Sequence, residues 1–205
     1  MDLISKIKFD GNYDNWFKSI ASELMNNYVL KVNKKKYRLT ELEFYYFKQK
    51  DHEDKHAHQH GQQLTSGQWY FHGSGLDITF GDKAKKIFGG ILIRGIIDIK
   101  NYKYIDGSLK VVTEIFKQIE SIDTHKIEFG LLRTPLEQEE QPVRTTRIGL
   151  NENTHPKFHK KLYRFIVEIN SKHQFKEKTR VAKQMQKDGH LVDDINKKFG
   201  YKIIS

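Results

Sequence analysis

The sequence predicts an α+β fold, a single domain in which a curved, mainly antiparallel sheet is flanked by helices. Short apolar runs alternate with glycines through the middle of the chain, and amphipathic helical stretches lie toward both ends. Strands separated by glycine-containing turns are typical of hairpins. A length of 205 residues with only three prolines favours one packed core over two. We assign the α+β domain to residues 1–170 and a basic helical extension to residues 171–205.

The first predicted element is a helix at residues 12–28. Asn12 or Asp14 is available to cap its start. Its apolar side chains recur at helical spacing and form one stripe, which consists of Trp16, Phe17, Ile20, Leu24 and Tyr28. We therefore expect an amphipathic helix that packs against the core.

A strand is predicted next, at residues 37–47, with the sequence YRLTELEFYYF. Side chains alternate between the two faces of a strand, so Glu41 and Glu43 share a face with Leu39. A solvated face on an edge strand would explain two neighbouring carboxylates. A carboxylate held among aromatic rings for chemistry would explain them equally well, and periodicity leaves both interpretations open.

The stretch that follows, KQKDHEDKHAHQHGQQLTSG, has no apolar periodicity, and we expect a functional loop there. It contains His52, His56, His58 and His60, with Asp54 among them. Alternating histidines can present several imidazoles to one metal, which would suit a metal-dependent hydrolase. A metal site also needs convergent ligands and groups that orient them, and spacing within one loop guarantees neither. We expect one or two functional histidines and predict no metal or other cofactor.

The remaining elements are predicted from the same two patterns, apolar residues at helical spacing and apolar residues in strand-length runs. Three strands are predicted between glycines, at 69–72, 76–80 and 90–99. The rest of the chain is assigned to a helix at 108–122 with Ser108 as its cap, strands at 126–132, 144–150 and 162–169, and a helical tail at 175–199.

Aromatic residues and one arginine stand out in these strands. Alternation sends Trp69 and Phe71 to one face, where we expect core packing, and leaves Tyr70 and His72 available to a pocket. Arg94 interrupts the apolar run GGILIRGII. Burying a cation without a partner is very costly, so we expect Arg94 to pair with a carboxylate or a phosphate.

The charge composition favours an anionic partner. The formal net charge is +10, and residues 172–205 carry nine Lys or Arg against four Asp or Glu, which is half of that excess. Nucleic acid is the commonest intracellular polyanion. The absence of cysteine excludes disulfides, thiolate metal sites and thiol nucleophiles. With neither a secretory leader nor a long apolar run in the sequence, we expect an intracellular monomer that binds DNA electrostatically and does not enter a membrane.

A series of short motifs occurs in an order that resembles one protein family. The motifs are Glu41-Leu42-Glu43-Phe44-Tyr45, Asp54 to His58, Gly67-Gln68-Trp69-Tyr70-Phe71-His72, Leu92-Ile93-Arg94-Gly95, Arg147-Ile148-Gly149-Leu150 and Leu162-Tyr163-Arg164-Phe165-Ile166. The methylpurine (alkyladenine) DNA glycosylases carry similar motifs in the same order: E-T-E-A-Y, D-x-x-x-H, G-x-x-Y-x-Y, L-L/I-R-A/G, R-I-G-V/I and P-W-R-F-Y-V. The resemblance covers roughly residues 37–167.

This resemblance implies a monofunctional N-glycosidic hydrolase that removes an alkylated or deaminated purine from DNA. It implies that Glu43 is the general base that activates water for attack on the sugar C1′, and that Arg94 holds this carboxylate or the water in place. The matched strand contains no lysine, so water rather than a lysine is the expected nucleophile. The base would be bound by Tyr45, His58, Tyr70, His72 and Asp77. From the charge distribution, rather than the resemblance, we expect Lys34, Lys35 and Lys36 to contact the nucleic acid, together with Arg147 of the matched motif.

Departures from the family pattern keep an alternative open. His72 stands where the family has its second pocket aromatic, and Asp77 is the nearest counterpart of a pocket asparagine. The hairpin HGSGL offers glycine and serine where the family inserts a bulky wedge into the duplex. Base flipping costs a few kcal/mol, so either Leu76 supplies the wedge or the substrate is already unpaired. The alternative function is a nucleic-acid or nucleotide binding module that keeps the fold without catalysis.

Overall fold

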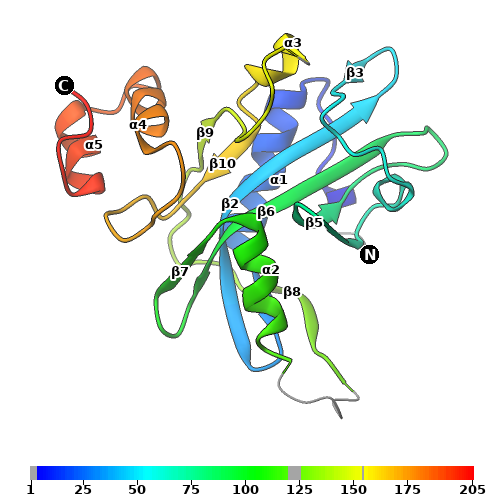
Figure 1. The fold of residues 1–205 in the computed structure, drawn as a ribbon, viewed down its shortest axis with the longest axis horizontal. Coiled ribbons are helices and arrows are strands. Elements are labelled where there is room, and N and C mark those ends of the chain that lie inside the picture. Colours follow the sequence, from blue (N-terminus) through cyan, green and yellow to red (C-terminus); the bar gives the residue numbers. More distant parts are fainter. Residues whose placement is uncertain (1–3, 120–125, 154) are drawn as a thin grey trace.

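A curled antiparallel sheet forms the centre of the molecule (Figure 1), in a computed structural model that describes residues 4–119, 126–153 and 155–205. Its main path runs in the order β4-β5-β6-β2-β1-β8, and the predicted α+β fold is confirmed. The strands are β1 (Tyr28–Val32), β2 (Lys35–Lys48), β3 (His52–Glu53), β4 (Trp69–His72), β5 (Gly75–Thr79), β6 (Phe88–Asp98), β7 (Lys103–Asp106), β8 (Phe129–Arg133), β9 (Val143–Thr145) and β10 (Arg164–Ile166).

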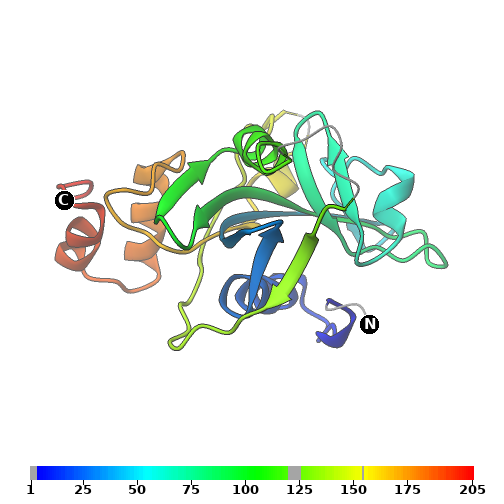
Figure 2. The ribbon, with the colours of Figure 1, turned by 90° about the horizontal axis from the view of Figure 1, so that it is seen from below.

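Helices cover both faces of this sheet. Figures 1 and 2 show α1 and α2 on opposite faces, with α4 and α5 together beside one end of the sheet. The helices are α1 (Tyr13–Asn27), α2 (Ser108–Phe116), α3 (Pro156–His159), α4 (Lys178–Lys187) and α5 (Val192–Phe199), with short 3-10 helices at η1 (Ile4–Lys6) and η2 (Gly61–Leu64).

Helix α1 packs on the sheet through the predicted apolar stripe. Asn12 caps it, because its side chain accepts a hydrogen bond from the Asn15 backbone N–H at 3.1 Å. The fully buried Phe17 stacks on Phe44 of β2 with ring centroids 5.0 Å apart. Burial of aromatic rings between α1 and the sheet contributes to the main core, which also includes Val111 and Ile115 of α2.

Strand β2 lies inside the sheet, so the interpretation of a solvated edge strand is wrong. It pairs with β6 on one side and with β1 and then β10 on the other, and neither face of its middle section is exposed. The pairing with β6 is irregular around Thr40, where Glu41 lies opposite Gly95. The register is the same on both sides of this point, with Leu39 opposite Ile96 and Leu42 opposite Ile93, so the alternation that places Leu39, Glu41 and Glu43 on one face continues through it.

Several predicted boundaries were wrong. Ser108 is the first residue of α2, not its cap, since the N-cap is Gly107 with φ of 120°. The predicted C-terminal end of that helix at 120–122 falls outside the described residues. The single helix predicted at 175–199 is two helices that end and begin around Gly189, a residue with positive φ. Strands β9 and β10 are shorter than predicted, and β1 and β7 were not predicted.

The C-terminal helices have a small core of their own. It joins two residues at the end of the sheet to apolar side chains of α4 and α5, and comprises Ile166, Ile169, Phe175, Val181, Ala182, Met185, Ile195, Phe199 and Ile204. In the described part of the chain, no helix combines the length and the apolar character needed to cross a membrane.

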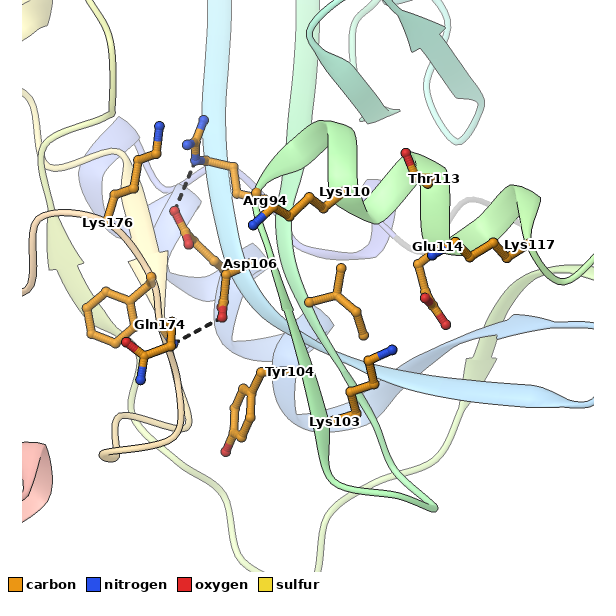
Figure 3. A pocket seen from close by; sticks show the side chains of 14 residues that line it. Arg94, Lys103, Tyr104, Asp106, Lys110, Thr113, Glu114, Lys117, Gln174 and Lys176 are labelled. Carbon is orange, nitrogen blue, oxygen red and sulfur yellow. Dashed lines mark hydrogen bonds and ion pairs between the residues drawn. The ribbon is translucent and has the colours of Figure 1, made fainter.

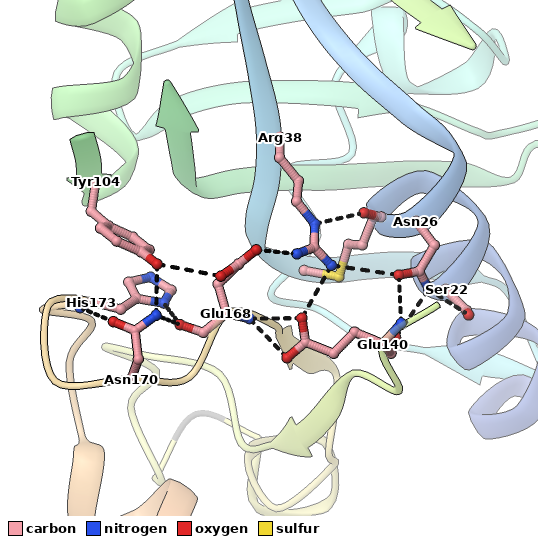
Figure 4. Close-up of polar contacts among 9 residues, drawn as sticks. Ser22, Asn26, Arg38, Tyr104, Glu140, Glu168, Asn170 and His173 are labelled. Atoms are coloured by element: carbon pink, nitrogen blue, oxygen red, sulfur yellow. Dashed lines mark hydrogen bonds and ion pairs between the residues drawn. The ribbon is translucent and has the colours of Figure 1, made fainter. Parts of the chain in front are cut away.

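A buried arginine connects this C-terminal region to the sheet and to α1 (Figure 4). Arg38 donates to Glu140 at 3.1 Å and to Glu168, and its Nε donates to the Met25 carbonyl oxygen at 3.1 Å. Glu168 lies within hydrogen-bonding range of the Tyr104 hydroxyl on β7. These bonds fix the segment after β10 against the sheet.

Candidate functional site

Several of the predicted site residues line one cavity of about 250 Å³, which we call the histidine pocket. It is enclosed by β2, β4, β5, β6, the start of α2 and the loop after β9. Its lining includes Tyr45, His56, His58, His72, Asp77 and Arg94, together with Gln63, Ser74, Leu92, Ser108 and residues 148–150. Of the predicted site residues, the structure thus brings together Tyr45, His58, His72, Asp77 and Arg94.

Glu43 lies directly beneath this pocket rather than on its surface. Its side chain is fully buried, with 0% exposure. It accepts hydrogen bonds from the Ile148 backbone N–H and the Tyr45 hydroxyl, both at 2.8 Å, and lies 3.4 Å from Arg94 Nε. All three of these residues line the pocket. Only this single layer of groups separates the carboxylate from the cavity.

Burial raises the pKa of Glu43 above its ordinary value, although the positive charge of Arg94 opposes the shift. Burial also raises the pKa of Tyr45, and the neighbouring Glu43 charge adds to that effect. A carboxyl group with a raised pKa beside a cavity is a common property of general acids and bases. The environment of Glu43 is therefore chemically suited to proton transfer.

Arg94 pairs with carboxylates, as the sequence predicts. Its Nε donates to Glu41 Oε1 at 3.0 Å, and the same oxygen accepts from Arg164 Nε at 2.7 Å. Arg164 is fully buried and was not predicted as a site residue. Glu41 is therefore held between two guanidinium groups, and the three side chains form a buried ionic cluster.

Arg147 was predicted to contact nucleic acid, but its side chain is in the interior. It is 0% exposed, pairs with Asp54 at 2.5 Å and donates to the Phe44 carbonyl oxygen at 2.9 Å. Its guanidinium lies 4.5 Å from the Tyr45 ring centroid. Arg147 therefore supports the pocket wall and is not accessible to a phosphate.

The opposite wall of the pocket is a hydrogen-bonded series. His72 Nε2 lies 3.0 Å from Asp77 Oδ1, and Gln63 donates to Asp77 Oδ2 at 3.2 Å. The His58 ring is 4.5 Å from that of His72 and nearly perpendicular to it. Burial, followed by the neighbouring His72, lowers the pKa of His58, so a neutral imidazole faces the cavity.

Two neighbours of His72 do not lie where they were expected. Tyr70 is outside the lining of the pocket, and its ring stacks on that of His60 with centroids 4.8 Å apart. Phe71 was expected in the core but is 43% exposed, whereas Trp69 packs partly buried against the core. The strand lies at the end of the sheet path, and the Phe71 ring contacts Phe116 and Phe129 at the surface.

The histidine loop does not converge on a metal. His52 is a core residue, with its ring nitrogens 2.8 Å from the Tyr46 carbonyl oxygen and 2.9 Å from the Tyr163 hydroxyl. His56 and His58 line the pocket, while His60 stacks on Tyr70. Among residues 4–119, 126–153 and 155–205, no group of three or more potential ligands is arranged to hold a metal ion.

The predicted lysine cluster lies at the turn between β1 and β2. Lys34 and Lys36 are exposed, but Lys35 pairs with Asp98 at 2.5 Å. None of the three lines the histidine pocket. Any contact that they make with nucleic acid is therefore outside the pocket.

The proposed wedge residue is not available. Leu76 on β5 is 0% exposed and belongs to the main core. The turn before it consists of Gly73 and Ser74, of which Ser74 lines the pocket. The β4–β5 hairpin therefore presents no bulky side chain at its turn.

Comparison with known proteins adds one relative. No family model matches the sequence. The chain is similar to an uncharacterized protein of Acanthamoeba polyphaga mimivirus, with 31% identity over 142 residues. The similarity covers 58% of this chain and 65% of the mimivirus protein, which is slightly less than two thirds of its length. Because that protein is uncharacterized, the function of this chain has to be argued from the site itself.

Proposed function

We propose that this protein is a monofunctional N-glycosidic hydrolase that removes a modified purine base from nucleic acid, and that it acts as an intracellular monomer. The observation that carries the proposal is the buried Glu43, with its raised pKa and with Arg94 and Tyr45 between it and a pocket. The pocket is polar at one wall, where His58, His72 and Asp77 offer groups that can hydrogen-bond a base edge.

In this mechanism Glu43 accepts a proton from a water molecule that attacks the sugar C1′. The contact with Arg94, at 3.4 Å, is the longest of the three contacts to the carboxylate. A water molecule therefore reaches Glu43 most directly from the Arg94 side. The guanidinium would hold the water and favour the ionised carboxylate that the reaction requires.

The test is the release of free base from oligonucleotides that carry an alkylated or deaminated purine, measured by mass spectrometry in single strands and duplexes. The wild-type protein should release base and leave an abasic site. Glu43→Gln should lower the rate by about a hundred- to ten-thousandfold while the protein remains folded, because it removes a general base.

Glu41→Gln is the matched control, since it changes the neighbouring carboxylate of the same strand. Because Glu41 bonds to Arg94 and Arg164, Glu41→Gln should lower the melting temperature. The protein that remains folded should release base at a rate close to that of the wild type. A Glu43 variant that is folded and fully active would refute the assignment.

A nucleic-acid or nucleotide binding module without catalysis is the second candidate. Two observations favour it: both oxygens of Glu43 already accept hydrogen bonds, and the β4–β5 turn contains no bulky residue. The same assay separates the candidates, because a binding module would retain oligonucleotides without releasing any base.

A further inference from the structure

A second cavity adjoins the histidine pocket and was not predicted from the sequence. It has a volume of about 400 Å³ and lies between β7, α2 and the segment before α4 (Figure 3). Arg94 lines both cavities, so the two meet at this side chain. We call this second cavity the lysine groove, after Lys103, Lys110, Lys117 and Lys176 in its lining.

The charge in the groove is unbalanced in favour of cations. All four lysines are exposed, and in the described part of the chain none of them forms an ion pair with a carboxylate. The acidic side chains of the lining bond to the protein instead. Glu41 pairs with two arginines, Asp106 accepts a hydrogen bond from the Gln174 backbone N–H at 3.0 Å, and Glu114 accepts one from the Tyr37 hydroxyl.

The wall that carries Lys176 is held in place by buried bonds. His173 is 0% exposed, lies 2.8 Å from Asp106 and stacks on Tyr104 of β7. The Lys176 carbonyl oxygen accepts a hydrogen bond from Arg164 at 2.9 Å. Arg164 also bonds to Glu41, so the groove wall and the Glu43 site share one set of contacts. The groove is therefore a fixed feature of the fold.

We propose that the lysine groove binds the phosphodiester backbone of an unpaired nucleic-acid strand whose target base enters the histidine pocket. The entry of a base rests on the proposed function. The choice of a phosphodiester follows from several free ammonium groups along one groove, which suit a chain of regularly spaced anions better than a single carboxylate.

The choice of an unpaired strand follows from the β4–β5 hairpin and its surroundings. Without a wedge, the protein has nothing to replace a base that leaves a duplex stack. Phe71 and Phe116, on β4 and α2, are 43% and 55% exposed, and their rings lie 5.9 Å apart. Phe116 belongs to α2, the helix that carries Lys110 of the groove. Exposed aromatic rings together with a cationic groove are typical of proteins that bind single strands by stacking.

The experiment compares two variants of the full chain, each lacking four exposed lysines. One carries Lys103→Ala, Lys110→Ala, Lys117→Ala and Lys176→Ala; the matched control carries Lys183→Ala, Lys187→Ala, Lys197→Ala and Lys198→Ala in the C-terminal helices. Binding is measured by fluorescence anisotropy at several salt concentrations. The probe is a labelled single-stranded oligonucleotide without any modified base, and a duplex of the same sequence serves as the second probe.

We expect the groove variant to lose at least about tenfold in affinity for the single strand and its log–log salt slope to fall by about 3, at roughly 0.7 per phosphate contact. The control variant should stay close to wild type, and the duplex should bind more weakly than the single strand. Equal losses in both variants, an unchanged groove variant, preferred duplex binding or no binding by the wild-type protein would each overturn the inference.

These outcomes are separate from those of the base-release assay. Single-strand binding that depends on the groove, without base release, would uphold the groove and refute the hydrolase. Base release together with unchanged binding by the groove variant would uphold the hydrolase and refute the groove.

Discussion

Glu41 and Glu43 are two residues apart on one strand, yet their surroundings differ. Glu41 is held by two arginines, whereas Glu43 accepts from a backbone N–H and a tyrosine hydroxyl. A carboxylate between two guanidinium groups is held in place by charge-assisted hydrogen bonds. Glu43 has only a longer contact with Arg94, and burial raises its pKa.

The raised pKa of Glu43 predicts a pH-dependent effect on stability that holds whether or not the protein is an enzyme. A carboxyl group with a higher pKa in the folded state favours folding when it is protonated. This contribution is fully present below the unfolded pKa and is lost as the pH rises through the folded pKa. Glu43→Gln cannot titrate and should remove it.

The melting temperature of the wild-type protein, measured relative to Glu43→Gln, should therefore be higher in acid and fall as the pH rises toward neutral. Differential scanning calorimetry of both proteins across that range measures the difference directly. Parallel curves at all pH values would show that burial does not perturb this carboxyl group.

Residue-level predictions succeeded where a single energetic argument applied. The pairing of Arg94 follows from the cost of burying a cation, and it was confirmed. The exposure of Phe71 and the burial of Arg147 depend on which segments cover them, and the sequence does not display that. Arg164 could have been suspected, because it too is a cation among the apolar residues LYRFIV.

Strand β6 shapes the pocket through the absence of side chains. A Cβ at Gly90 would lie 2.4 Å from Asp77 Oδ2 and 2.6 Å from Gln63 Nε2. These two groups form the wall with His72, so the wall can occupy its position only because residue 90 is a glycine. This is the close backbone approach that glycine within a strand permits.

Gly90→Ala should therefore push the Asp77 and Gln63 side chains away from β6. The overpacking should lower the free energy of unfolding by about 1–3 kcal/mol. Gly130→Ala is the control, since a Cβ at that strand position meets nothing within 4 Å. In thermal melts, the Gly90 variant should unfold at a lower temperature and the Gly130 variant close to wild type. Equal melting temperatures for the two variants would show that the wall adjusts without cost.

The elements that could be predicted are those with a long, clear period. Helix α1 and the long strands β2 and β6 have such periods and were confirmed. Strands β1 and β7 are short and mix lysine with apolar residues, so their pairing depends on neighbours distant in sequence. The histidine pocket was predicted as a set of residues, but its geometry follows from contacts across β2, β5 and β6.

Within the described residues the molecule has two apolar clusters, one between the sheet and its helices and one around the C-terminal helices. Phe199 is 0% exposed in the second cluster, whereas Tyr201 nearby is 51% exposed. Clusters of this kind can open separately, because stability is not uniform across a structure. One wall of the lysine groove, formed by β7 and α2, adjoins the first cluster, and the other, formed by the segment before α4, adjoins the second.

Phe199→Ala should lower the free energy of unfolding of the second cluster by about 3–5 kcal/mol, because it leaves a cavity there. Hydrogen exchange followed by mass spectrometry should then show faster exchange in α4 and α5, with little change in β2 and β6. Tyr201→Ala should leave both regions unchanged. Equal acceleration in β2 and β6 would mean that the two clusters unfold as one cooperative unit.

The irregular pairing around Thr40 depends on a glycine of the neighbouring strand. Leu39 lies opposite Ile96 and Leu42 opposite Ile93, so each strand has two residues between these pairs. Those residues include Glu41 and Arg94, the pair that supports the candidate site, and also Gly95. A Cβ at Gly95 would lie 2.9 Å from Thr40 Oγ1 and 3.0 Å from the Cβ of Glu41. Any side chain at residue 95 would therefore displace Glu41 and its contact with Arg94, so a position with no functional group of its own sets the geometry of the site.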